Sequence, residues 1–445
     1  MNKTFSLSAL LLALLLPLSA QEKPKEWNLT SCIQYALDRN ITLQKSRNSY
    51  DQSQVDVRTA QAALFPSLSF SSSQNYANQP YGGVGSVGSS FNDGSIHTYS
   101  GNYSLSARLT LYNGNKNRNN IRYNRLQAET AQQTIEEQKN QIILAVTEAY
   151  LQILYAAESI TINQHTLQTD SAQLARTRQL LQSGLKTRTD VAQLESQLSN
   201  DAYQLVQAQN QLDNYKLQLR QLLEIQGDEE MPLTLPELED ADVIRLLPGK
   251  DEVYRTALQI MPEIKSSRLS TQAAQLNEKI AKSGYLPSIS LQASTGTGHN
   301  SVSDLNFGQQ LKRSWNNSVG LTLSLPIFDN RSTKSAVEKA KLQTLSSKLE
   351  ESEQAKTLYK TIETAWQNAY ASQNEFMAAA EKEKYAEESY KLVSEQYAVG
   401  LKNTVELLTE KNTLLSARQQ KVQAKYLSLL NQKLLRFYQG ETPAL

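Results

Sequence analysis

The sequence predicts a mostly α-helical chain that also carries membrane β-strands and that is built from two copies of one structural repeat. Three observations predict this fold class. The segment LFPSLSF at residues 64–70 returns as YLPSISL at residues 285–291. Two very long stretches, residues 115–183 and 331–399, contain neither proline nor glycine. Four shorter segments alternate apolar residues with small polar ones, which is the period of a β-strand.

The duplication defines the expected organisation of the chain. Residues 109–220 align with residues 325–436 without a gap, so each copy is one structural unit. The expected parts are a signal peptide at 1–20, a first repeat at 21–226, an acidic linker at 227–250, a second repeat at 251–440 and a tail at 441–445.

The N-terminus has the pattern of an export signal. Lys3 precedes an apolar run at residues 7–18, and Ala20 ends an acceptable cleavage site before Gln21. This run is too short for a membrane anchor, and the rest of the sequence has no longer one, so any membrane crossing must use β-strands. The formal net charge of +1 gives no reason to expect nucleic acid as a partner.

No residue pattern predicts catalysis, a cofactor or a metal site. The single cysteine, Cys32, is expected to be a small buried residue on the first helix. The three histidines, His97, His165 and His299, are far apart and lack the spacing of metal ligands. Because no Ser/His/Asp set or phosphate-binding loop stands out either, we expect a protein that is not an enzyme.

The first element of each repeat is predicted to be a helix, at residues 30–62 and 251–283. Thr30 and Ser31 are the N-cap candidates of the first one. Pro66 and Pro287 mark where these helices have already ended, because the residue before a proline disfavours helical geometry.

Two strands follow each helix, with expected ranges of 66–76, 102–112, 287–296 and 316–328. One face of each is apolar, and the other carries Ser, Thr, Asn and Gln, with Arg108 as the main exception. A soluble sandwich sheet would also alternate, but its wet face usually carries charges. The small polar face therefore favours strands of a membrane barrel around a water-filled lumen.

The ends of the strands differ in character. An aromatic residue lies at the helix-proximal end of each strand, which predicts a girdle at one membrane interface: Phe65, Tyr112, Tyr285 and Phe328. The other ends lead into glycine-containing stretches at residues 77–98 and 295–315, which we expect to be polar loops facing the outside.

Each strand pair is followed by a long helix and a returning helix. Apolar residues recur every seven positions in the first long stretch, which predicts left-handed supercoiling: Val146, Ile153, Ile160, Leu167, Leu174 and Leu181. At about 1.5 Å per residue, each stretch spans on the order of 100 Å. Gly184 and Gly400 should end the long helices, and the returning helices are expected at residues 189–225 and 404–438. The proline-containing linker between the repeats is expected to hold a short strand at 231–235.

Four strands cannot close a membrane barrel, so several chains must each contribute a sheet. The residues alone allow a dimer or a trimer. The whole mature chain, however, resembles the TolC family of outer-membrane efflux factors. The resemblance rests on the paired LFPSL and YLPSI segments, the passage LPIFDN at residues 325–330, and two turns of the form Gly-Leu-Lys-x3-Asp/Glu. The first repeat departs from the pattern at Thr110, which stands where the second has Pro326.

This resemblance implies a homotrimer with a twelve-strand barrel in the lipid of the cell outer membrane and a twelve-helix tunnel through the periplasm. It also implies a passive exit duct that docks with a periplasmic adaptor and an inner-membrane pump of the RND or ABC type. Such proteins carry no chemistry and need no cofactor.

The resemblance also implies roles for the hairpin turns. The tips that would contact the adaptor are Gly184, Leu185, Lys186, Gly400, Leu401 and Lys402. Residues at positions of a gate or constriction are Glu406, Thr409, Asp190, Thr189 and Tyr397. The expected gate contacts are Asp190–Tyr397 and Thr189–Lys402, with three copies of Glu406 forming a negative ring. The alternative is that these are ordinary solvated turn residues.

A secreted periplasmic coiled-coil protein without a barrel, structural or adaptor in role, is the alternative function. It explains the seven-residue repeats but not the four membrane-type strands. Within the duct interpretation, drug efflux, metal efflux and protein secretion remain open, because substrate choice lies mostly in the pump.

Overall fold

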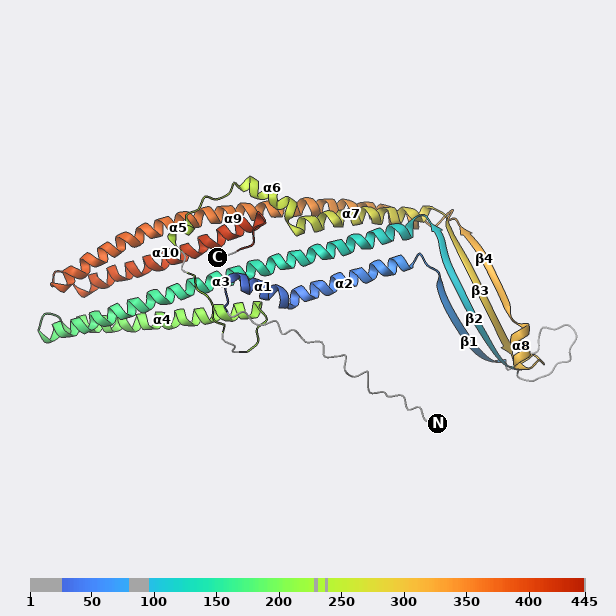
Figure 1. Cartoon of the computed structure of the whole chain (residues 1–445), viewed down its shortest axis with the longest axis horizontal. Coiled ribbons are helices and arrows are strands. Elements are labelled where there is room, and N and C mark those ends of the chain that lie inside the picture. The colour runs from blue at the N-terminus through green and yellow to red at the C-terminus, as the bar shows by residue number, and fades with distance from the viewer. Residues whose placement is uncertain (1–25, 80–95, 228–230, 237–238, 444–445) are drawn as a thin grey trace, which may run out of the picture.

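The computed structural model describes residues 26–79, 96–227, 231–236 and 239–443. The molecule is long and narrow, with a β-sheet at one end and two helical hairpin turns at the other (Figure 1). Helices dominate, and all four strands form one sheet, which confirms the predicted fold class. The predicted signal peptide lies outside the described residues.

The two repeats have the same order of elements. The first consists of α1 (Leu29–Arg39), α2 (Ile41–Ala62), β1 (Ser67–Gln79), β2 (Ile96–Asn113), α3 (Lys116–Gln182) and α4 (Arg188–Leu222). The second consists of α6 (Lys250–Ile260), α7 (Pro262–Lys282), β3 (Ser288–Asn300), β4 (Asn316–Ser324), α9 (Ser332–Ala398) and α10 (Thr404–Tyr438). Three short helices supplement them: α5 (Asp240–Val243), η1 (Ser283–Tyr285) and α8 (Phe307–Arg313).

The first element of each repeat is two helices, so the prediction of one continuous helix was wrong at two places. Asn40 separates α1 from α2, and its side chain caps α2 by accepting from the backbone N–H groups of Thr42 and Leu43. In the second repeat, Pro262 is the first residue of α7, where its missing N–H costs nothing. The N-cap of α1 is Asn28, two residues before Thr30 and three before Ser31, the predicted candidates.

The sheet has the order β1-β2-β3-β4, and every neighbouring pair is antiparallel. β1, β2 and β3 extend further from the helices than predicted, whereas β4 ends at Ser324. A register shift between Thr110 and Tyr112 interrupts the alternation, so that Tyr112 rather than Leu111 lies opposite Ile289. The predicted loop at 295–315 contains the end of β3 and helix α8, and most of the loop at 77–98 lies outside the described residues.

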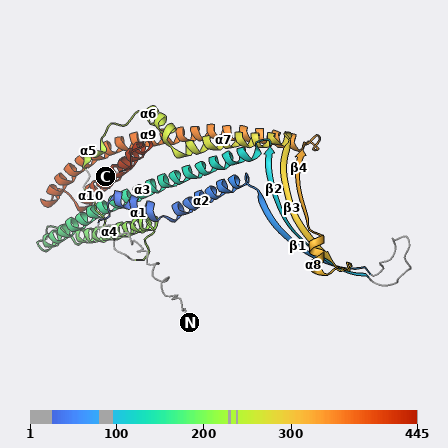
Figure 2. The same cartoon turned by 45° about the vertical axis from the view of Figure 1, so that its right-hand side comes forward.

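The sheet is a single layer that stands away from the helices (Figure 2). Its apolar face is bare: Phe70 is 68% exposed, Val319 is 78% exposed and Leu321 is 66% exposed. On the opposite face, serine hydroxyls hydrogen-bond in pairs across neighbouring strands, as in Ser71–Ser104 at 2.7 Å. A soluble sandwich would bury the apolar face against a second sheet, so the structure contradicts that alternative.

Aromatic residues lie toward both ends of the sheet. Phe65, Tyr285 and Phe328 are exposed near the helices, with exposed fractions of 72%, 51% and 84%. Tyr76 on β1 and Trp315 just before β4 are exposed toward the other end. This arrangement fits two membrane interfaces on either side of an apolar band.

The last two residues before each long helix share one backbone conformation, although the sequences differ. Gly114 and Asn115 have φ angles of 64° and 63°, and the aligned Asn330 and Arg331 have φ angles of 52° and 67°. Gly114 is also sterically required, because an added Cβ would lie 2.9 Å from the Ser283 carbonyl oxygen. The departure of the first repeat from the expected motif therefore leaves these two φ angles unchanged, although β2 continues to Asn113 and β4 ends at Ser324.

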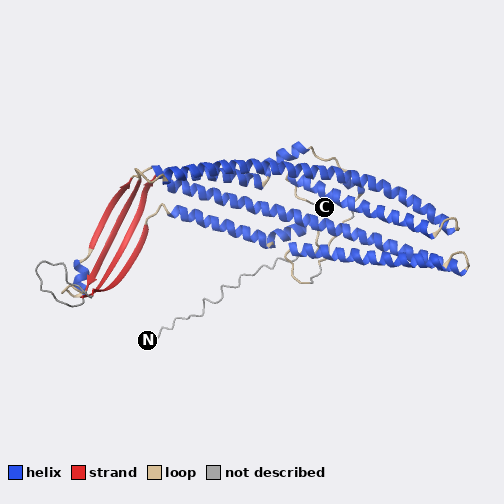
Figure 3. Ribbon diagram, turned by 180° about the vertical axis from the view of Figure 1, so that it is seen from behind, coloured by secondary structure: helices blue, strands red, loops and turns tan. Residues whose placement is uncertain are grey.

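The helices form two successive layers along the long axis (Figure 3). Near the sheet, α2 packs on α3, α3 on α7, and α7 on α9. Toward the turns, α4 packs on α3, α3 on α10, and α10 on α9. Helix α3 contains an 18-residue window with a mean hydropathy of 1.2, and half of that window is buried against its neighbours, as in the core helix of a bundle.

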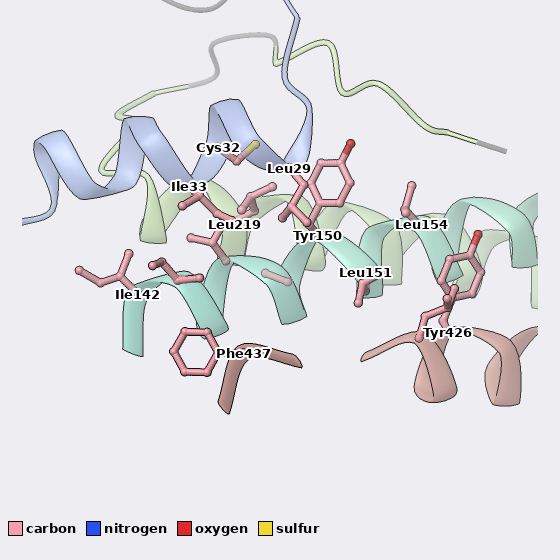
Figure 4. Packing of buried hydrophobic residues seen from close by; sticks show 14 of the residues in the cluster. Leu29, Cys32, Ile33, Ile142, Tyr150, Leu151, Leu154, Leu219, Tyr426 and Phe437 are labelled. Atoms are coloured by element: carbon pink, nitrogen blue, oxygen red, sulfur yellow. The ribbon is translucent and has the colours of Figure 1, made fainter. Parts of the chain in front are cut away.

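The main hydrophobic core lies where these two layers meet (Figure 4). Cys32 of α1, Tyr150 of α3, Leu219 of α4 and Phe437 of α10 are all buried there. Burial raises the pKa of the Cys32 thiol to about 12, and the prediction of a buried structural cysteine is confirmed.

The inter-repeat linker runs across this core. In place of the predicted short strand, Leu233 makes one parallel bridge with Trp27. The Tyr150 hydroxyl donates to the Thr234 carbonyl, and the Trp366 indole N–H donates to the Pro248 carbonyl at 3.0 Å. The linker thus joins the N-terminal segment to both long helices.

Candidate gate at the hairpin ends

The two turns at the end of the molecule away from the sheet share one backbone design. Each long helix ends in a Schellman motif: Leu185 N–H donates to the Leu180 carbonyl, and Leu401 N–H donates to the Gln396 carbonyl, both at 2.9 Å. The preceding residues, Gly184 and Gly400, have φ angles of 78° and 84°. Open space surrounds both positions, so glycine is needed for its backbone conformation and not for lack of room.

The returning helices begin with matching capping boxes. Thr187 and Asp190 exchange side-chain to backbone hydrogen bonds at the start of α4, and Asn403 and Glu406 do the same at the start of α10. Asp190 and Glu406 are aligned positions in the two repeats. Each therefore uses one carboxylate oxygen to begin its helix, a role that the T-x-x-D and N-x-x-E patterns could have predicted.

The second oxygen of Asp190 joins the two hairpins. Its Oδ1 accepts a hydrogen bond from the Thr404 hydroxyl of α10 at 2.5 Å. Burial acts against the Asp190 charge, but hydrogen bonds from Thr404 and Thr187 outweigh it, so the pKa of the Asp190 carboxyl is below its usual value. The carboxylate is thus charged at neutral pH, and its hydrogen bond to Thr404 is charge-assisted.

Tyr397 completes this junction. It is 1% exposed, and its hydroxyl lies 3.3 Å from the Thr177 hydroxyl and 3.4 Å from the Thr404 hydroxyl. The Lys186 ammonium of the opposite turn lies 3.7 Å from the centre of the Tyr397 ring, in cation–π geometry. Three side chains, two from the first hairpin and one from the second, therefore contact Tyr397.

Within one protomer, the residues of the predicted gate pairs have other direct partners. Asp190 reaches Tyr397 only through Thr404, because the Thr404 hydroxyl occupies the space between them. Lys402 does not contact Thr189 but binds Glu406 at 2.5 Å within its own turn, while Thr189 is exposed in the first turn of α4. Thr409 is also exposed, and its hydroxyl donates to the Val405 carbonyl of its own helix.

The ion pair with Lys402 changes the electrostatic character of Glu406. The Lys402 ammonium and the Asn403 backbone N–H together hold the pKa of the Glu406 carboxyl below its usual value. The carboxylate is therefore fully ionised, but the neighbouring cation offsets its charge. Each protomer contributes an ion pair at this position instead of an isolated negative charge.

Sequence reasoning missed a buried cluster further up the hairpins. Lys411 of α10 forms ion pairs with Asp170 of α3 and with Asp201 of α4, the latter at 2.5 Å. All three side chains are less than a tenth exposed. Gln197 donates to the other oxygen of Asp201 at 2.9 Å. This triad, Asp170–Lys411–Asp201, connects the first hairpin to the second through three helices.

The charge balance of the triad favours a bound proton. Two carboxylates face one ammonium, and the site is largely shielded from water. Burial, together with the neighbouring Asp201, raises the pKa of Asp170 to about 7 despite the opposing effect of Lys411. Below that pH the triad is a neutral ion pair plus a carboxylic acid, and above it the triad carries one uncompensated negative charge.

A cavity of about 440 Å³ lies beside the triad, between α3, α9 and α10. Asp170 and Lys411 form part of its wall, together with Tyr390 and Arg418. Water can therefore approach one side of the triad. Within the described residues, no group of three or more His, Cys, Asp or Glu is placed to hold a metal ion.

The tips themselves present apolar side chains to solvent. Leu185 is 71% exposed, Leu401 is 76% exposed, and Val399 beside it is 72% exposed. Exposed leucines at the end of a long coiled coil are suited to contact with another protein.

The chain is similar over nearly its whole length to known outer-membrane channels. It is 27% identical over 424 residues to the outer membrane protein TolC of Escherichia coli (strain K12), covering 91% of this chain and 80% of that protein. It is 24% identical over 319 residues to the alkaline protease secretion protein AprF of Pseudomonas aeruginosa, a match that covers 71% of this chain and 64% of that protein. Among solved structures, CusC matches with a TM-score of 0.80 at 17% identity, covering 94% of this chain and 95% of that one.

VceC of Vibrio cholerae matches with a TM-score of 0.75, also at 17% identity, over 93% of this chain. The family model for outer membrane efflux protein matches residues 32–224 and 253–441, which are the two repeats. The predicted resemblance is thereby confirmed, and the chain belongs to the outer membrane efflux protein family.

Proposed function

We propose that three copies of this chain form one continuous duct through which an inner-membrane pump, joined by a periplasmic adaptor, expels substrates from the cell. The strongest support is the bare sheet with open edges at β1 and β4. An open sheet cannot reside in lipid, because its edge N–H and C=O groups would lack partners. Pairing of β4 with β1 of the next protomer satisfies both edges and closes the barrel.

The two faces of the sheet indicate which side faces the lipid and which faces the lumen when the barrel closes. The leucine-bearing face is suited to lipid, and the serine-bearing face is suited to a water-filled lumen. A coiled-coil protein without a barrel offers no use for such a sheet. The protein lies in the outer membrane, as its family does, with the helical tunnel in the periplasm. A duct of this kind transmits solutes without performing chemistry.

Neighbouring residues on β4 allow a matched test of this topology. Leu321 belongs to the apolar face and Thr322 to the polar one. Leu321→Arg should hinder insertion, since an arginine near the bilayer midplane costs about 2–4 kcal/mol, whereas Thr322→Arg should be tolerated. The yield of heat-modifiable trimer in outer-membrane fractions measures both. Equal yields of the two variants would contradict the assignment of the faces.

We further propose that the Asp190–Thr404–Tyr397 contacts and the Asp170–Lys411–Asp201 triad hold the tunnel closed at its periplasmic end. Both join α10 to the first hairpin, so outward movement of α10 must break them. The exposed Leu185 and Leu401 lie at the tips where an adaptor would bind and start this movement. Cysteine crosslinks to an adaptor from Lys186 or Lys402 test the orientation. Crosslinks obtained only from the opposite end of the molecule would contradict it.

A further inference from the structure

The polar face of the sheet carries a single formal charge. Across β1 to β4 as described, Arg108 is the only Asp, Glu, Lys or Arg. It lies on the same face as the hydrogen-bonded serine pairs, because Ser106 and Ser104 precede it at alternate positions on β2. In a closed barrel this face lines the lumen, so the Arg108 side chain belongs to the wall of the pore.

The register surrounds Arg108 with small neutral neighbours. Ser67 lies opposite it on β1, Gln292 lies opposite on β3, and Gly320 follows on β4. A Cβ at Gly320 would meet no atom within 4 Å, so the row is open beyond Gln292. The guanidinium therefore has room above the sheet and is exposed to the pore side.

Gln292 fixes the guanidinium without neutralising it. With its amide oxygen turned toward Arg108, Gln292 accepts from Nη2 at 2.7 Å and from Nε at 3.2 Å. The two hydrogen bonds converge on this one oxygen and hold the planar group in orientation. A glutamate of nearly the same shape would make the same contacts and cancel the charge. The neutral amide leaves a full positive charge, since arginine stays protonated at any physiological pH.

We propose that Arg108, repeated in the three protomers, forms a ring of positive charge in the barrel lumen that favours the passage of anionic solutes. This inference rests on the proposed duct function. Rings of arginine or lysine select anions in other pores because they raise the local anion concentration and repel cations. At the opposite end of the duct, each Glu406 carboxylate is paired with Lys402, so these residues do not present a ring of isolated negative charges that would oppose the effect of Arg108.

The alternative is that Arg108 only ties β2 to β3. Charge and hydrogen bonding are separable here, because the two residues of the pair can be changed one at a time. Arg108→Gln removes the charge. Gln292→Glu keeps the arginine and its hydrogen bonds but neutralises it. Arg108→Lys keeps the charge and loses the two-point contact.

The test is the reversal potential of single channels in planar bilayers across a KCl gradient. Arg108→Gln and Gln292→Glu should each shift the ratio of K⁺ to Cl⁻ permeability severalfold toward K⁺, and Arg108→Lys should remain close to wild type. The shift should be large near 0.1 M salt and small near 1 M, because the screening length falls from about 10 Å to about 3 Å.

Each outcome decides between the possibilities. If the wild-type protein forms no channel, the proposed duct function fails. If it conducts and neither neutralising variant changes selectivity, the duct stands and the charge ring is refuted. A shift in Arg108→Lys as large as that in Arg108→Gln would assign Arg108 a structural role only. Wild-type conductance of the variants near 1 M salt shows that their pores are intact.

Discussion

The two helical hairpins derive from equivalent sequence, yet they fill matching positions with opposite chemistry. Asp170 and Asp201 of the first hairpin align with Ala386 and Ala417 of the second. The aspartates are buried around Lys411, whereas the alanines pack in a small apolar cluster. The second hairpin shows that this geometry packs well without charges. Because a buried ion pair is often no more stabilising than an apolar contact, the triad is better explained by a switching role than by stability.

The two turns also differ in the partners of two aligned residues. Asp190 and Glu406 begin their helices in the same way, but their remaining oxygens bind different partners. Asp190 reaches across to Thr404 of the other hairpin, and Glu406 stays within its own turn with Lys402. Of these two carboxylates, only Asp190 therefore links the hairpins, so the two turns of the protomer are not equivalent.

Removing the cation of the triad should give the largest effect. Lys411→Met leaves two buried carboxylates without their cation, and breaking such a pair costs about 3–5 kcal/mol. Thermal unfolding of the purified protein measures this loss. The triple variant Asp170→Ala, Asp201→Ala, Lys411→Met copies the alanines of the second hairpin and should recover most of the stability. A triple variant as unstable as the single one would contradict the comparison.

The shared proton of the triad predicts a pH dependence of stability. The pKa of Asp170 rises from 3.8 in the unfolded chain to about 7 in the folded protein. The folded state therefore holds a proton that the unfolded state releases, and the free energy of unfolding should fall as pH rises from about 4 to about 7. One pH unit corresponds to about 1.4 kcal/mol, so the change from pH 5.5 to 7 is about 2 kcal/mol for this group.

Asp170→Asn serves as the control, since its amide does not titrate. Its thermal unfolding should lose this part of the pH dependence between pH 5.5 and 7. An identical slope in wild type and variant would show that other groups are responsible.

The two turn glycines test whether the turns are equivalent. Gly184→Ala and Gly400→Ala should each cost about 1–2 kcal/mol, because alanine disfavours the left-handed conformation that both require. Circular dichroism melting measures the cost. A clear difference between the two would show that one turn relaxes where the other is held by its contacts.

The smallest expected effect is the loss of the hydroxyl that joins the hairpins. Thr404→Val keeps the shape but removes the hydrogen bond to Asp190, at a cost of about 1 kcal/mol. Channels of this variant should open more often in planar bilayers.

Lys402→Ser is the counterpart in the second turn. It removes the cation beside Glu406 and should raise the preference for cations without loosening the contact between the hairpins. If Thr404→Val and Lys402→Ser changed channel opening and cation preference in the same way, the two turns would not differ in function.

The sequence predicts most reliably the elements whose apolar pattern repeats over many residues. The 67-residue helices α3 and α9 and the alternating faces of the strands follow from many residues in agreement. The break at Asn40 was missed because one capping side chain decides it, and the preceding and following segments share a helical period. Helix α8, of seven residues, is too short for a periodic signal.

The site was predicted less completely than the fold. Asp190 and Tyr397 were placed at the junction, but their partner Thr404 was not identified, since contacts across a bundle depend on how two helices are rotated against each other. The triad was missed for the same reason: Asp170 and Lys411 are 241 positions apart in the sequence. The comparison of repeats held a usable signal, because charged residues in one copy align with buried alanines in the other.

The open edges of the sheet also have a consequence for how the protein is made. Among the described residues, the outer edges of β1 and β4 pair with no strand, so a lone protomer cannot enter lipid with its backbone hydrogen bonds satisfied. Membrane insertion must therefore wait for the encounter of chains, and its rate should rise steeply with their concentration. Until then, the leucines of the strands stay exposed to the aqueous periplasm, where they make the unassembled chain prone to aggregation and dependent on holding chaperones.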